Sequence, residues 1–283
     1  MRIGIGLPNA IPGTPGSLVA TWAARAEEQG FALLASIDRI VYGNGEPLAS
    51  LTAAAAVTAT IELFTDILLA ATRQPVPLAK QAATLDWLSG GRLTLGLAPG
   101  GRQDDFAVAG MRFTNRGRRF DATLDTMVQT WRGELVGGAN RPIGPRPARG
   151  EIPMLIGGTS PQAIARVARV GSGWTAGSGA GDMIGPLISQ VHQAWGAAGR
   201  SGTPRISRLT YFALGDNVRA TAEANLHDYY GPRADAVLSR TCWSPEQARA
   251  FVANADGLGV GEVVFFPAVG DLSQVDRLAD AVL

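Results

Sequence analysis

The sequence predicts an α/β fold built as a single (β/α)8 TIM barrel, with residues 1–283 in one domain. Short apolar segments alternate eight times with segments of helical periodicity, an order typical of parallel strands covered on both faces. The length suits one barrel, since such barrels have about 250 residues. No G-x-G-x-x-G pattern follows the first strand, which disfavours the alternative, an open doubly wound sheet.

Each predicted strand is a short, mostly apolar run between turn residues. The strands are expected at residues 2–7, 31–37, 62–71, 92–98, 152–156, 173–176, 206–214 and 262–268. The helices are expected at residues 17–29, 48–60, 77–88, 117–132, 160–170, 182–198, 218–238, 245–257 and 271–282. Ser17 is the expected N-cap of the first helix, and Gly30 its end. Long connections predict insertions after strand 4 and strand 7. Residues 133–151, rich in Gly, Pro and Arg, are expected to form a loop within the domain.

The composition excludes several classes of function. The formal net charge is +1, so no overall field attracts nucleic acid or an anionic membrane, and neither is expected as a partner. Cys242 is the only cysteine and the two histidines lack ligand spacing, so no metal site is expected. The N-terminus does not read as a signal peptide, and the apolar stretch 47–61 is too short to span a bilayer. We therefore expect a cytoplasmic protein.

Residues 152–168, IPMLIGGTSPQAIARVA, predict a strand, a tight turn and a helix with an uncrowded first turn. The free N–H groups and the dipole of a helix start favour an anion. In a barrel this turn would lie at the C-terminal strand ends, where function is found. The turn Gly157, Gly158, Thr159 and Ser160 is therefore a candidate phosphate site, although Gly-Gly before a helix is also an ordinary barrel turn.

Residues 79–133 resemble the bacterial luciferase-like flavin monooxygenase family. The matching blocks are Leu85-Asp86, Leu88 to Arg92, Gly96, Asp105-Phe106, Gly110, and Arg116, Gly117 and Arg118 with Asp121. The stretch from Ile152 to Trp174 and the last helix match further blocks, so the resemblance covers nearly the whole chain. It implies a barrel that binds reduced FMN or the deazaflavin F420, with the ring at the strand ends.

The resemblance also implies where the cofactor phosphate lies, near strands four to six. The hydroxyls of Thr159 and Ser160 would hold it together with Arg116 or Arg118, and Ala98 at the end of strand four would adjoin the cofactor. The alternative for Arg116, Arg118 and the adjacent Arg119 is a solvated helix start with Asp121 as their ion-pair partner.

Family members usually break the third strand with a bulge beneath the flavin, often at a cis peptide bond. By alignment the bond falls at Thr65-Asp66, so both residues are candidate cofactor contacts. Asp66 stands where the family keeps a small residue. It is expected to act as an acid–base group or ring contact, or else to pair with Arg39.

After strand two the family often carries Asp-His, whereas this chain has Asp38-Arg39. With no histidine at a predicted strand end, the remaining candidates for chemistry are Asp66, Asp38, Arg39 and Tyr42. Cys242 and Trp243, in the insertion after strand 7, are expected to contact the substrate in its pocket.

Three functions follow from the resemblance. The first is FMNH2-dependent monooxygenation of an apolar organic substrate, such as a biosynthetic intermediate. Because no NAD(P)H fingerprint is present, a separate flavin reductase would supply the reduced FMN. The alternatives are an F420-dependent dehydrogenase or reductase and a flavin-binding protein without catalysis. A homodimer is compatible with the sequence.

Overall fold

Eight parallel strands close into one barrel in the order β1 to β8, and β1 pairs with β8 to complete it. The computed structural model describes the backbone of residues 1–283 and every side chain except those of residues 179, 180 and 182. The predicted (β/α)8 barrel is confirmed. The strands are β1 Arg2–Gly6, β2 Leu33–Ser36, β3 Glu62–Leu69, β4 Leu93–Ala98, β5 Met154–Gly157, β6 Gly173–Ala176, β7 Arg205–Phe212 and β8 Glu262–Pro267.

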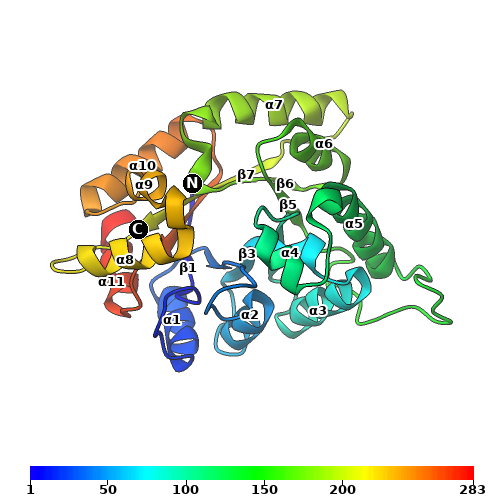
Figure 1. Cartoon of the computed structure of the whole chain (residues 1–283), viewed down its shortest axis with the longest axis horizontal. Helices are drawn as coiled ribbons and strands as arrows, with labels where there is room; N and C mark the ends of the chain where they lie inside the picture. Colours follow the sequence, from blue (N-terminus) through cyan, green and yellow to red (C-terminus); the bar gives the residue numbers. More distant parts are fainter.

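Eight helices form a ring around the strands (Figure 1). They are α1 Ser17–Glu28, α2 Pro47–Ala55, α3 Pro75–Leu88, α5 Arg116–Arg132, α6 Pro161–Val170, α7 Ile184–Ala197, α10 Pro245–Gly257 and α11 Ser273–Val282. Proline at the first helical position favours the start of four of them, α2, α3, α6 and α10. The N-cap of α1 is Gly16 rather than the predicted Ser17, which is already helical, and no side chain caps this helix.

Short helices were missed in two of the long connections. The stretch 99–115, predicted to be a loop, contains α4 Gln103–Val108, whose first turn carries Asp104 and Asp105 as the helix dipole favours. A 3-10 turn, η2 Phe113–Asn115, follows it. The predicted helix 218–238 is divided into α8 Arg219–Tyr230, η4 Gly231–Arg233 and α9 Ala234–Leu238. The division falls at Gly231, with φ +54°, followed by proline.

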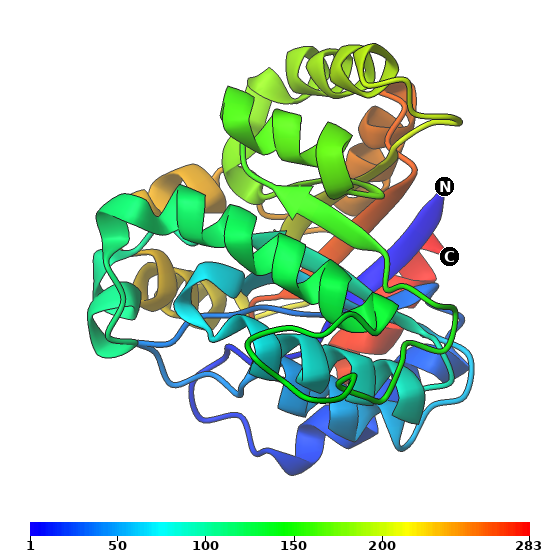
Figure 2. The same ribbon diagram turned by 90° about the vertical axis from the view of Figure 1, so that its right-hand side faces the viewer.

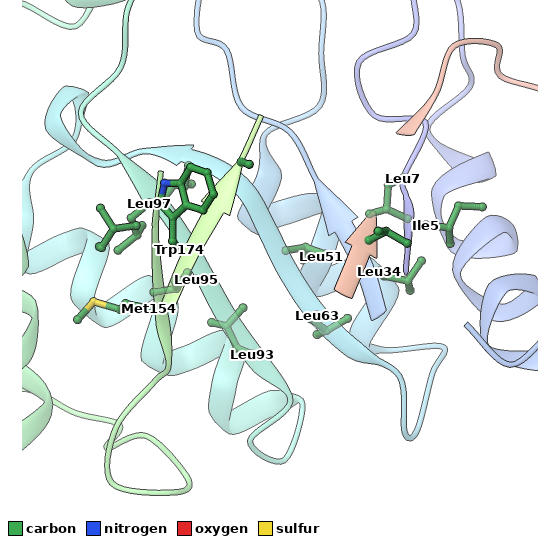
Figure 3. Close-up of a cluster of buried hydrophobic side chains, with 14 of the residues drawn as sticks. Ile5, Leu7, Leu34, Leu51, Leu63, Leu93, Leu95, Leu97, Met154 and Trp174 are labelled. Atoms are coloured by element: carbon green, nitrogen blue, oxygen red, sulfur yellow. The ribbon is translucent and has the colours of Figure 1, made fainter. Parts of the chain in front are cut away.

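The core fills the barrel and the layer between its strands and the helices. In Figure 3, Leu95 and Leu97 of β4 lie near Trp174. Leu34 lies away from them, near Ile5 and Leu7, and all six side chains are buried. Both chain ends lie side by side at one end of the molecule (Figure 2), as expected for a barrel that starts with a strand and ends with a helix. Within the described part of the chain, no helix is long and apolar enough to cross a membrane.

The third strand is interrupted by a bulge. Thr65 still pairs in register with Leu95 of β4, and the register has shifted when pairing resumes at Leu68. The cis peptide bond joins Asp66 to Ile67, one residue later than the predicted Thr65-Asp66 bond. The prediction was one residue early because Thr65 is part of the regular ladder, where its hydroxyl also donates to the Gly96 carbonyl at 2.9 Å. The bulge places Asp66 and Ile67 at the wall of a cavity.

Candidate active site

A cavity of about 600 Å³, here called the main cavity, opens at the C-terminal ends of the strands. Its strand side comes from the ends of β2, β3, β6 and β7, and its outer side comes from α8, η4 and α9. The lining includes Ile37, Asp38, Asp66, Ile67, Leu69, Gly101, Arg102, Asp105, Gly158, Thr159, Trp174, Thr175, Leu209, Tyr229, Tyr230, Arg233, Val237 and Arg240. Such a volume is typical of sites for small ligands, which range over roughly 300–1,000 Å³.

A second space of about 320 Å³, here called the side cavity, adjoins the main cavity. The two share four wall residues, Ile67, Leu69, Gly101 and Gly158. The side cavity is otherwise lined by Ala98, Pro99, Gly100, Gly157, Ser160, Ala163 and Arg166. The structure thus brings the predicted turn 157–160 and Ala98 to one adjoining pair of cavities.

The turn between β5 and α6 is shaped for close approach. Gly158 has φ +114°, and its carbonyl accepts a hydrogen bond from the Trp174 indole at 2.9 Å. A Cβ atom on Gly157 would overlap the end of the Ile67 side chain, which would have to move to admit it. Ser160 caps α6, since its hydroxyl accepts from the Ala163 amide at 3.2 Å. The Thr159 side chain lies at the main cavity.

The arginine at the side cavity is Arg166 of α6, a residue that the sequence analysis missed. Its Nε and Nη2 donate to Asp121 at 2.7 and 2.9 Å, and Nη2 also donates to the Gly117 carbonyl. Nη1 has no hydrogen-bond partner among the described residues. The signal was the spacing, because Ser160, Ala163 and Arg166 are three residues apart and therefore share one helix face.

The two arginines predicted for the phosphate lie elsewhere. The Arg116 guanidinium stacks on the Phe113 ring at 3.9 Å and donates to the Phe113 carbonyl. Arg118 is exposed, and neither residue lines the main cavity or the side cavity. Their suggested partner Asp121 pairs with Arg166 instead, because α5 presents Asp121 to the neighbouring α6. The structure therefore places an arginine of α6, and neither of the two predicted arginines of α5, at the side cavity.

Asp66 is the buried acid of the main cavity, with only 4% of its surface exposed. Its Oδ1 accepts a hydrogen bond from the Thr175 hydroxyl of β6 at 2.8 Å. Its Oδ2 is buried and has no protein partner among the described side chains. Burial raises the pKa of Asp66 to about 7, and the Thr175 hydrogen bond opposes the rise only in part. The carboxyl can therefore hold a proton at Oδ2 near neutral pH.

The alternative pairing of Asp66 with Arg39 does not form. Arg39 lies 3.8 Å from the Asp104 carboxylate and donates to the Tyr229 carbonyl at 2.8 Å. Arg39 lies outside the lining of both cavities. It anchors α8 to the loop after β2, which is a structural role.

The other predicted candidates are engaged in the scaffold. Asp38 lines the main cavity, but its Oδ2 accepts from Arg73 and from the Leu69 amide, each at 2.9 Å. Tyr42 donates to Asp228 at 2.6 Å and lies outside the cavity lining. Thr65 also lies outside it, for the reason given above.

The predicted pocket contacts after β7 are replaced by others. Cys242 is buried beside the end of β7, where it pairs with Phe212 as an isolated bridge, and Trp243 packs under Arg219. Neither lines the main cavity. The segment instead contributes Tyr229, Tyr230, Arg233, Val237 and Arg240 to the cavity. Helix boundaries within the insertion decide which residues face inward, and the sequence pattern did not resolve them.

These residues fit a flavin or deazaflavin, which consists of a flat ring and a phosphate-bearing chain. The turn at Gly157 and Gly158, which carries no side chain, the Nη1 of Arg166 and the helix start of α6 suit a phosphate. The unpartnered Oδ2 of Asp66 suits a polar atom of the ring. Ile67 and Leu69 lie on the wall that both cavities share.

The chain belongs to the luciferase-like monooxygenase family, whose model matches residues 1–262. An uncharacterized protein of Mycobacterium tuberculosis is 32% identical over 186 residues, which cover 63% of this chain and 66% of that protein. The chain thus matches slightly less than two thirds of the length of that relative.

Two solved structures share the fold at low sequence identity. The coenzyme F420-dependent tetrahydromethanopterin reductase of Methanopyrus kandleri has a TM-score of 0.78 and 18% identity, with 99% of this chain and 98% of that chain covered. The oxygenating constituent of 3,6-diketocamphane monooxygenase of Pseudomonas putida, solved with FMN, has a TM-score of 0.77 and 15% identity. The match covers 99% of this chain and 96% of that chain. The shared fold is thus used with either cofactor.

Proposed function

We propose that this chain is an oxidoreductase that uses reduced FMN to oxygenate a small organic substrate, and that a separate flavin reductase supplies the FMNH2. The observation that carries the proposal is that a buried acid, Asp66, and the turn Gly157–Ser160, which suits an anion, line two cavities that adjoin each other. Membership of the luciferase-like monooxygenase family supports the reaction class.

The reduced flavin, when bound, supplies the electrons that activate O2. The protein supplies position and protons. Gly158, Ser160 and Arg166 would hold the phosphate at the side cavity, and Ile67 and Leu69 would contact the ring from the shared wall. Asp66 would hold a proton at Oδ2, beside the ring or the substrate. The α8–α9 segment covers the outer side of the main cavity and would limit the entry of water.

A second candidate is hydride transfer with F420, because a reductase of the same fold depends on that coenzyme. The same turn and arginine would hold the F420 phosphate. The two functions differ in their need for O2, since hydride transfer to or from a deazaflavin proceeds without it.

Oxygen consumption separates the two functions. The purified chain would be mixed with FMN, a flavin reductase and NADH, together with a panel of small organic substrates. We expect substrate-dependent O2 uptake above that of the reductase alone, with one oxygen atom incorporated into the product from 18O2. Anaerobic turnover with F420 or its reduced form, together with no substrate-dependent O2 uptake above that of the reductase alone, would establish the second candidate instead. Tight binding of neither cofactor would contradict both.

A further inference from the structure

Three arginines line the main cavity near its outer side. Arg102 follows β4, while Arg233 and Arg240 flank α9. None of them lies within 4 Å of an acidic group among the side chains that the structure describes. Arg102 donates to the Tyr229 carbonyl at 3.1 Å, and Arg240 approaches the Ser178 and Ala236 carbonyls at 3.3 Å. The three guanidinium groups therefore keep N–H donors for a ligand.

The carboxyls on the same lining balance little of this charge. Asp38 is paired with Arg73, which does not line the cavity. Asp66 is about half protonated near pH 7, because burial raises its pKa to about 7. Asp105 accepts the Ile40 and Val41 amides at 3.0 and 2.8 Å. Among the described side chains of this lining, three arginines thus face three carboxyls, of which one is paired with Arg73 and one has a raised pKa.

Tyr230 lies beside these arginines, and their positive charge acts on its pKa. Burial raises the pKa of Tyr230, and the nearby Arg102 and Arg233 oppose that rise. The same lining also has apolar side chains, among them Leu209 of β7 and Val237 of α9. The main cavity therefore combines an apolar wall with a cationic rim.

The cofactor phosphate does not account for the rim. Gly157, Ser160 and Arg166 line the side cavity, whereas Thr159 of the same turn lines the main cavity. None of the three rim arginines lines the side cavity. If the phosphate occupies the side cavity, the rim remains available to a second anionic group.

We propose that the substrate is an amphipathic acid, whose apolar body packs against Leu209 and Val237 and whose carboxylate is bound by Arg233 and Arg240, with Arg102 beside them. Naming this ligand as the substrate rests on the proposed function; the anion subsite itself does not. The proposal narrows the expectation of a purely apolar substrate, because an uncharged molecule would leave the rim arginines without a counter-charge.

The test compares two probes that differ only in charge, 4-butylbenzoate and 4-butylbenzamide. Their affinities would be measured by calorimetry on the full chain, both cofactor-free and saturated with whichever of FMN or F420 binds. We expect the carboxylate to bind about tenfold or more tightly than the amide, as one charge-assisted contact allows. The variant Arg233→Gln/Arg240→Gln should reduce this preference to about threefold or less.

Arg132→Gln is the matched control. Arg132 is the last residue of α5 and lines a separate cavity of about 520 Å³. This variant therefore removes a positive charge without changing the three rim arginines. It should keep the preference. Equal binding of the two probes to the wild type, or an unchanged preference in the double variant, would overturn the proposal.

Cofactor titrations of the same proteins separate the remaining outcomes. FMN or F420 should bind the double variant as it binds the wild type. If F420 affinity falls while the probe preference stays, the arginines serve the cofactor and the proposal is overturned. If neither cofactor binds the wild type but the preference is present and lost in the variant, the anion subsite stands and the proposed function fails.

Discussion

Asp66 is a buried carboxyl whose proton is bound more tightly in the folded chain than in the unfolded one. Its pKa is about 7 when folded, against about 3.9 for an unfolded aspartate. Between these values the folded state binds the extra proton, so stability falls as pH rises from about 4 to about 7 and then levels off. The total change is on the order of 4 kcal/mol at most.

Asp66→Asn should remove this pH dependence, because the amide does not ionise. At pH 4 the variant and the wild type should unfold at similar denaturant concentrations, and the variant should become the more stable as the pH rises to 8. Urea unfolding at several pH values between 4 and 8 checks the expectation. Parallel stability curves for the two proteins would show that Asp66 is already ionised throughout this range.

The same substitution tests the chemical role of Asp66. If the proton at Oδ2 is used in turnover, Asp66→Asn should lower kcat by a factor of about 10² or more, while cofactor affinity stays near that of the wild type. The wild-type rate should also decline above about pH 7, and the residual rate of the variant should lack that decline. Full activity with an unchanged pH profile would remove Asp66 from the mechanism.

At the scale of the element, the start of α6 combines a structural cap with a binding turn. The Ser160 hydroxyl caps the helix, whereas the exposed Thr159 hydroxyl has no hydrogen bond among the described residues. Ser160→Ala should therefore lower the free energy of unfolding by about 1 kcal/mol, and Thr159→Ala should leave it nearly unchanged. Paired denaturation curves measure the difference. Equal stabilities of the two variants would mean that the Ser160 cap contributes nothing.

The sequence predicted long elements better than short ones. Runs such as 93–98 are mostly apolar because parallel strands are buried on both faces, so they stand out from their surroundings. Helices α4 and α9 have 6 and 5 residues, too few to show a helical period. The lining that comes from α9 was therefore missed with it.

The candidate site was predictable only where the topology of the barrel decides the position of a residue. Strand ends are fixed by topology, and this rule correctly brought Asp66, Ala98 and the turn 157–160 to the cavities. The direction of a long side chain is set by helix packing, which the sequence does not show. Arg116 and Arg118 were therefore preferred to Arg166, although only Arg166 reaches the side cavity.

At the scale of the whole molecule, barrel closure assembles the site from segments far apart in sequence. Asp66 of β3 meets Thr175 of β6 across 109 positions, and α8 covers the cavity that both of them line. The central claim is that one cofactor spans the two cavities formed in this way, with its phosphate at α6.

Titration of FMN and F420 fluorescence tests that claim most directly. We compare the wild type, the variant Thr159→Ala/Arg166→Gln, and Arg118→Gln as a control that removes an arginine outside both cavities. The wild type should bind one cofactor, and Arg118→Gln should bind it equally well. The double variant should lose about tenfold or more in affinity, since a charge-assisted hydrogen bond contributes roughly 1.5–3 kcal/mol. Circular dichroism would confirm that all three proteins are folded. Wild-type affinity in the folded double variant would contradict the account.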